Sequence, residues 1–319
     1  MRVSGSRSHA QAHQLYHAAL VAWKEPTLTF EPPQGFSIRI YLPDGAAEGL
    51  RIIERSNWSG IGVVCPRSLV TQKVSEYPQY FGRAGVYVLV GSSESGEREQ
   101  IYVGLADPIG PRLKDHLKAK DKDFWTNAVF FVSKDESLNR AHIQYLESNL
   151  HELAVRTKRA QLNNKVVPQA GSLSAPDKDD AGNFMADILT ILPLVGVNAF
   201  ESVPEPPITI LSILNPNKDY SARGYESVRG FVVREGSQAT SNPAPSLSKS
   251  GTAIREDLIG DGVLIKDPAN DYYYMFTQDY EFKSSSSAAV VCMGYSTNGR
   301  EAWKTDDGRT LRQLQESSE

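Results

Sequence analysis

Cysteine is nearly missing from this 319-residue sequence, which contains only Cys65 and Cys292. Two cysteines so far apart exclude a disulfide framework and a zinc site made of several cysteines. No apolar run approaches the ~20 residues that a helix needs to cross a bilayer. The apolar stretch near the N-terminus is interrupted by His17 and lacks a cleavage site, so it does not have the pattern of a secretory leader. We therefore expect a cytoplasmic protein without membrane association.

An excess of positive charge is also missing, because 34 lysines and arginines face 38 aspartates and glutamates, a formal net charge of −4. This excludes a uniformly basic nucleic-acid binder, so any such binding depends on local patches. Residues 112–122 hold five lysines and arginines against two aspartates, and residues 156–165 hold four and no acid. Such clusters often form only a solvated face, but they can also follow a sugar–phosphate backbone.

The composition that remains is that of a globular protein, with 40% hydrophobic and 23% charged residues. The length predicts two or three domains. Pro-rich and Gly/Ser-rich stretches separate the segments. We predict an N-terminal extension (1–33), an N-terminal α/β segment (34–78), a core (79–167), a linker with a helix (168–218) and a C-terminal accessory domain (219–319).

The segments before the core carry two weaker patterns. A helix is predicted over residues 8–23, where His9, His13 and His17 share one face; that face could bind a transition metal or simply be solvated. Residues 36–42 alternate like a half-buried strand, and residues 60–65 read as a second strand. Between them, Asp44 is predicted to cap a helix that extends through Arg55.

The core has the clearest pattern of the chain. Residues 85–90 and 101–104 are two β-branched runs joined by a polar, Gly-containing turn, which predicts a β-hairpin. A helix follows, with Pro111 in its first turn. A third strand is predicted over residues 128–132 and a longer helix over residues 138–155. The fold class is therefore α+β, with a small three-stranded antiparallel sheet flanked by helices and a separate C-terminal α+β domain.

Two charged residues on the predicted helices fit chemistry at a phosphate. Arg112 lies near a helix N-terminus, where free N–H groups already favour an anion, and a guanidinium can bind a phosphate through two hydrogen bonds. His116 is its i+4 partner. Glu147 falls at the edge of the apolar helix arc beside Ile143 and Leu150, where a carboxylate is costly unless it is paired or binds a cation. Taken alone, Glu147 also fits an ordinary surface glutamate.

The motifs Gly85-Val86-Tyr87 and Tyr102-Val103-Gly104, followed by Arg112, His116 and Glu147, resemble in order and spacing the motif series of GIY-YIG nucleases. The resemblance covers residues 83–165, about a quarter of the chain. It implies that one tyrosine activates the attacking water and the other orients the water or the phosphate, without saying which. It also implies that Glu147 binds Mg²⁺ or Mn²⁺, and that His116 either relays a proton or is merely solvated.

Two positions are less certain within this resemblance. The closing asparagine of the series is assigned to Asn164, although Asn163 is only one residue away. The position after Gly104, often lysine or a small polar residue in the family, is Leu105 here. A mechanism that relies on a lysine at that point is therefore in doubt.

The remainder of the chain offers no catalytic pattern. Residues 168–183 have the composition of a linker, and residues 184–195 predict an apolar helix. Farther on we predict a strand at 230–234, a helix at 253–259, a hairpin within 262–276 and a helix at 288–293 that is capped by Ser284 to Ser287. This part resembles a small uncharacterised domain that accompanies GIY-YIG cores, and a recognition module or a purely structural role are both open.

These expectations combine into one functional hypothesis. The chain is predicted to be a metal-dependent DNA endonuclease with a catalytic set of Tyr87, Tyr102, Arg112, His116, Glu147 and Asn164. Its expected partners are DNA and Mg²⁺ or Mn²⁺, with no small-molecule cofactor. The alternative is a catalytically inactive DNA-binding or interaction protein built on the same scaffold.

Overall fold

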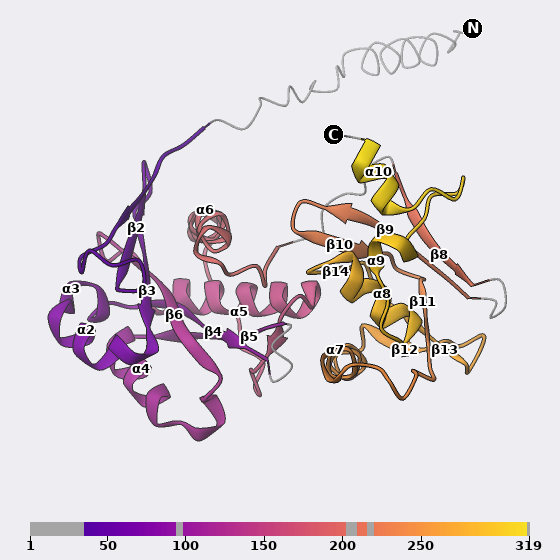
Figure 1. Ribbon diagram of the computed structural model, residues 1–319. Helices are drawn as coiled ribbons and strands as arrows, with labels where there is room; N and C mark the ends of the chain where they lie inside the picture. The colour runs from indigo at the N-terminus through magenta and orange to yellow at the C-terminus, as the bar shows by residue number, and fades with distance from the viewer. Residues whose placement is uncertain (1–34, 94–97, 202–208, 216–219, 318–319) are drawn as a thin grey trace, which may run out of the picture. The chain divides into compact units, whose positions relative to one another are not determined.

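The computed structural model describes residues 35–93, 98–201, 209–215 and 220–317 (Figure 1). The chain divides into two compact units, Met1–Ser37 and Ile38–Glu319, and the account below concerns the second. The predicted N-terminal helix with His9, His13 and His17 lies outside the described residues. The architecture is mixed α+β, as expected.

The first half of the unit is built on one sheet of seven strands, whereas a three-stranded sheet was expected. The strand order is β1-β2-β3-β6-β4-β5-β7, and all pairs are antiparallel except β5 with β7. The strands are β1 (Ile38–Tyr41), β2 (Arg51–Arg55), β3 (Gly60–Pro66), β4 (Gly85–Ser92), β5 (Glu99–Ala106), β6 (Trp125–Ser133) and β7 (Gln161–Leu162). The expected strands of the core are the neighbours β6, β4 and β5, and seven paired positions between β3 and β6 join them to the preceding segment.

The predicted helix between Asp44 and Arg55 is wrong, because β2 occupies the second half of that range. Its two isoleucines are buried and pair with both β1 and β3, a tertiary gain that outweighs local helix propensity. Asp44 instead accepts a hydrogen bond from the N–H of Leu50 and pairs with Lys73 at 2.6 Å. The carboxylate thus stabilises a loop and the following helix α2 (Val70–Glu76).

Alternate residues of the sheet pack into two different cores. Val86 and Val88 face α5 (Arg140–Thr157) and α6 (Ala175–Ile191). Tyr87 and Leu89 face the opposite side, with α2, α3 (Pro78–Phe81) and α4 (Ile109–Lys118). Figure 1 shows α4 and α5 beside the strands β4 and β5. The period-2 pattern of the sequence therefore decides which side chains reach the α4 face.

Side-chain caps mark the first residues of α5 and α6. Asn139 caps α5 through a capping box with His142, and Lys158 ends the helix in the left-handed conformation. The helix α6 begins at Ala175, well inside the stretch that we predicted as linker. Ser174 caps it by accepting a hydrogen bond from the N–H of Asp177, whose charge favours the first turn.

The second half of the unit has one core surrounded by two small sheets. Trp303 is fully buried in this core, against Phe231. The predicted strand at 230–234, the hairpin and the two helices are confirmed, with Ser284 as the N-cap of α8. The strands are β8 (Leu211–Asn215), β9 (Tyr220–Ser227), β10 (Gly230–Val233), β11 (Gln238–Thr240), β12 (Leu264–Lys266), β13 (Tyr273–Phe276) and β14 (Tyr280–Phe282). The helices are α7 (Lys249–Gly260), α8 (Ser285–Met293), α9 (Gly299–Ala302) and α10 (Leu311–Ser317).

Each half buries one of the two cysteines completely. Cys65 lies in β3 and Cys292 in α8, and both are free thiols. Burial raises the pKa of each thiol to about 12. Among the helices that the structure describes, none has the length and hydropathy of a bilayer span.

Candidate active site

Four of the six predicted site residues line one polar cleft of about 530 Å³. Tyr87 comes from β4, Tyr102 from β5, Arg112 from α4 and Glu147 from α5. His116 is buried behind the tyrosines, and Asn164 contacts the backbone of β5 at Val103 without being one of the residues that line the cleft. Residues 60 positions apart in the sequence thus reach a common space.

The strand register brings the two tyrosines together. Tyr87 pairs with Gly104 and Leu89 pairs with Tyr102, so both tyrosine rings lie on the α4 face of the sheet. The ring centroids are 6.1 Å apart. A Cβ atom at position 104 would collide with the ring and hydroxyl of Tyr87. The glycine of the second motif is therefore required for the tyrosine of the first to occupy its place.

Tyr87 and His116 form a buried polar pair. The Tyr87 Oη and His116 Nε2 atoms are 2.7 Å apart, and the side chains are 0% and 3% exposed. The His116 ring also lies edge-on to Tyr102, at 5.3 Å between centroids. Burial and the neighbouring Tyr102 raise the pKa of Tyr87 well above its usual range, and the hydrogen bond with Arg112 only partly offsets this. Tyr87 is therefore a neutral phenol at physiological pH.

Arg112 lies in the first turn of α4 and opens onto the cleft. Hydrogen bonding to Tyr87 and the nearby Tyr102 raise the pKa of Arg112 despite partial burial. Its guanidinium is therefore permanently charged, next to the free N–H groups of a helix N-terminus. This combination is suited to binding an anionic oxygen.

Glu147 lies at the exposed edge of β5 and lines the same cleft as the two tyrosines, although α5 packs on the opposite face of the sheet. Strand β7 pairs only with Gln100 and Ile101, so the later residues of β5 are paired with β4 on one side and have no described strand on the other. Burial raises the pKa of Glu147, while a hydrogen bond from the Leu105 N–H and the charges of Arg140 and Arg112 oppose that rise. Leu105 thus contributes its backbone N–H to the contact with Glu147.

The donor set around Glu147 fits a magnesium ion rather than a softer metal. Within the described ranges no cluster of three or more His, Cys, Asp or Glu side chains is present. Mg²⁺ commonly binds proteins through one or two carboxylates and takes its other ligands from water and phosphate oxygens. A half-buried carboxylate with a raised pKa that opens on a polar cleft meets this requirement.

Asn164 hydrogen-bonds to the sheet and not to the cleft residues. Its side chain accepts from the N–H of Val103 at 2.9 Å and donates to the C=O of Val103 at 2.8 Å. The side-chain oxygen of Asn163, by contrast, is buried with no hydrogen-bond partner in the described part of the chain. Asn164 rather than Asn163 therefore supports the strand between Tyr102 and Gly104.

Sequence reasoning missed several residues in or beside the cleft. Lys122 does not line the cleft but contacts one of its tyrosines, because its Nζ lies 2.8 Å from the centroid of the Tyr102 ring. Arg140 and Gln144 line the cleft beside Glu147. Their i, i+4, i+7 spacing on α5 was a signal that could have identified them. The other lining residues include Asp107, Asp115 and Gln169.

Comparison with known proteins bears on the second half of the chain only. Residues 213–315 match the model of a family described as a domain of unknown function (DUF4357). No curated protein and no solved structure matches the chain. The matched range covers the core around Trp303, whereas the cleft lies entirely before it.

Proposed function

We propose that the protein is a metal-dependent endonuclease that hydrolyses phosphodiester bonds in DNA with a GIY-YIG type of active site. The observation that carries this proposal is the convergence of Tyr87, Tyr102, Arg112 and Glu147, from four separate elements, on one polar cleft. The cleft supplies a fixed cation for the phosphate, a carboxylate for a metal and hydroxyl groups for a water, which are the requirements of phosphodiester hydrolysis.

The residues divide the reaction among them. Arg112 binds a non-bridging phosphate oxygen and stabilises the charge that grows there as the water attacks phosphorus. Tyr102, the more exposed tyrosine, orients the water by accepting one of its hydrogen bonds. As the water oxygen bonds to phosphorus and the bond to the leaving sugar oxygen breaks, Tyr87 takes up the water proton and passes its own to His116. Solvent protonates the leaving oxygen.

Glu147 is the residue that would hold Mg²⁺ or Mn²⁺, which when bound supplies charge neutralisation at the phosphate and at the leaving oxygen. Asn164 is assigned a positioning role because it hydrogen-bonds to the backbone of Val103, which lies between Tyr102 and Gly104. The cytoplasmic location and the DNA substrate remain parts of the same proposal. The clusters at 112–122 and 156–165 are the candidates for backbone contacts.

The test uses the full chain on supercoiled plasmid, with Mg²⁺ or Mn²⁺ and with an EDTA control. We expect nicked and then linear product in the presence of metal only. Glu147→Gln should abolish cleavage while DNA affinity stays within about twofold of wild type, because the amide keeps the size of the side chain but not its charge. Glu152→Gln, an exposed position on the same helix, is the matched control.

Two results would reject the mechanism: cleavage that persists in EDTA, or a Glu147→Gln variant with full activity. DNA binding without any cleavage under these conditions would favour the alternative, a non-catalytic DNA-binding protein on the same scaffold.

A further inference from the structure

Arg98 is a buried arginine that none of the predicted roles explains. It directly precedes β5, and its backbone C=O accepts from the N–H of Ser93, which extends the β4–β5 ladder by one step. The residue is only 5% exposed. A buried guanidinium is costly unless its N–H groups are satisfied and its charge is paired.

The guanidinium connects three separate parts of the unit. One arm pairs with Asp261, the residue that ends α7. The other arm donates to the backbone C=O of Lys158 at 2.8 Å, where α5 ends. The ring of Tyr280 on β14 lies 5.7 Å from it. Tyr280 and Asp261 both belong to the matched domain, so this domain holds the hairpin that carries the tyrosines and the helix that carries Glu147.

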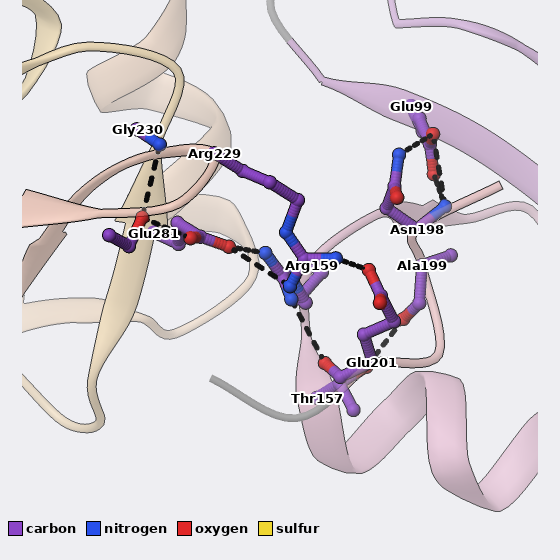
Figure 2. A network of polar contacts seen from close by, with 10 residues as sticks. Glu99, Thr157, Arg159, Asn198, Ala199, Glu201, Arg229, Gly230 and Glu281 are labelled. Carbon is purple, nitrogen blue, oxygen red and sulfur yellow. Dashed lines mark hydrogen bonds and ion pairs between the residues drawn. The ribbon is translucent and has the colours of Figure 1, made fainter. Parts of the chain in front are cut away.

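Other contacts gather around the same end of α5, as Figure 2 shows in part. The Thr157 hydroxyl donates to the C=O of Ala199 at 2.7 Å, and the Thr157 backbone C=O accepts from the side-chain amide of Gln278 at 3.1 Å. Arg159 pairs with the buried Glu281 of β14. Glu99, next to Arg98, accepts hydrogen bonds from the backbone N–H of Asn198 at 3.1 and 3.2 Å. Arg98 and these residues together form a larger polar junction at the end of α5.

We propose that the domain of unknown function acts as a clamp on the active site, and that Arg98 is the positioning residue through which it sets the β4–β5 hairpin relative to α5. The clamp rests on the proposed nuclease function. The two tyrosines lie on the β4–β5 hairpin and Glu147 lies on α5. The distance between them therefore depends on non-covalent contacts between the hairpin and the helix. A displacement of about 1 Å between such groups is enough to lower a rate ~10²-fold.

The experiment measures single-turnover cleavage, DNA affinity and amide hydrogen exchange on three variants of the full chain. Arg98→Met removes the charge but keeps most of the aliphatic stem. Asp261→Asn is the gentler second variant, because it keeps the size of a side chain that is 31% exposed. Arg312→Met, which breaks an exposed ion pair within α10 of the same domain, is the control.

We expect Arg98→Met and Asp261→Asn to lower the single-turnover rate tenfold or more, with DNA affinity within twofold of wild type. We also expect faster exchange in β5 and in the last turn of α5, and none of these changes in Arg312→Met. If rate and exchange remain at wild-type values, the clamp is rejected. A wild-type protein without nuclease activity would reject the proposed function alone, because hydrogen exchange still reports whether Arg98 joins the two elements.

Discussion

Tyr87 and Tyr102 differ in surroundings although both lie on one face of the sheet, and their substitutions should differ accordingly. Tyr87→Phe and Tyr102→Phe should each lower the cleavage rate by ~10²-fold or more, the scale of acid–base catalysis. Tyr87→Phe should also destabilise the fold by about 1–3 kcal/mol, because it removes the buried hydrogen bond between Tyr87 and His116. Plasmid cleavage and thermal unfolding measure the two effects. Tyr272→Phe, at a 76% exposed position, is the control. Normal cleavage rates in both variants would show that the two tyrosines only pack in the core and take no part in catalysis.

The raised pKa of Glu147 predicts how the stability of the folded protein depends on pH. Burial raises its pKa in the folded protein, so the native state holds this proton more tightly than the unfolded chain does. Its ionisation therefore lowers stability as the pH rises from the ordinary value of 4.5 through the raised value. We expect Glu147→Gln to unfold at the same or a higher temperature than wild type at pH 7, with the advantage fading toward pH 4.

Metal should reverse that order. Mg²⁺ that binds the ionised carboxylate stabilises the native state by mass action, so it should raise the unfolding temperature of wild type and not of Glu147→Gln. Glu152→Gln should respond to Mg²⁺ as wild type does. Equal stabilisation of all three proteins would show that the ion binds elsewhere.

At the scale of elements, the free edge of β5 determines how the site is supported. Three groups satisfy the edge in succession. The N–H of Asn163 donates to the C=O of Ile101, the side chain of Asn164 binds both backbone groups of Val103, and Glu147 accepts from Leu105. Along this edge of β5, the side chains of Asn164 and Glu147 therefore take the place of a neighbouring strand.

Asn164→Ala should consequently destabilise the protein by about 1–3 kcal/mol, because it removes both partners of a backbone position between Tyr102 and Gly104. Cleavage should slow without being abolished. Asn163→Ala is the matched control, and it should cost less because the side-chain oxygen of Asn163 has no partner in the described part of the chain. Urea unfolding distinguishes them, and an equal loss in both variants would contradict the assignment.

Local patterns predicted the elements around the site but not their assembly. The β-branched runs near Tyr87 and Tyr102 and the apolar arc of α5 are visible in the sequence, so hairpin and helix were expected correctly. The pairing of β3 with β6 depends on contacts about seventy residues apart, and no local signal marks it. The start of α6 was missed although Ser174 and Asp177 are typical of a helix N-terminus. The partners of Arg98 could not be inferred, because an isolated arginine carries no pattern.

At the scale of the whole molecule, burial changes which charges are available for DNA. Arg159 belongs to the second basic cluster, but its side chain is 11% exposed and paired with the buried Glu281. Burial and the neighbouring Arg229 lower the pKa of Arg159 to about 10. Arg159 is therefore withdrawn from contact with DNA. Apart from Arg112 in the cleft, the exposed basic residues are Lys118 and Lys120 in the first cluster and Arg156 and Lys165 in the second.

A salt titration of DNA binding tests this division. Lys118→Ala and Lys120→Ala should each weaken binding and reduce the slope of log K against log salt by ~1, one phosphate contact per lysine. Arg159→Ala should leave the slope unchanged and lower the unfolding temperature, because it leaves Glu281 buried without this partner. A reduced slope for Arg159→Ala would show that Arg159 itself contacts the DNA.

The two buried cysteines allow local unfolding to be followed by thiol labelling in the unmodified protein. A pKa of about 12 in place of 9.0 lowers the thiolate fraction at neutral pH by about a thousandfold, and burial blocks the reagent as well. An aromatic disulfide reagent should therefore label neither Cys65 nor Cys292 until the surrounding structure opens. Because one thiol lies in β3 and the other in α8, the order of labelling under rising urea shows which half gives way first. Peptide mapping reads this order without any substitution.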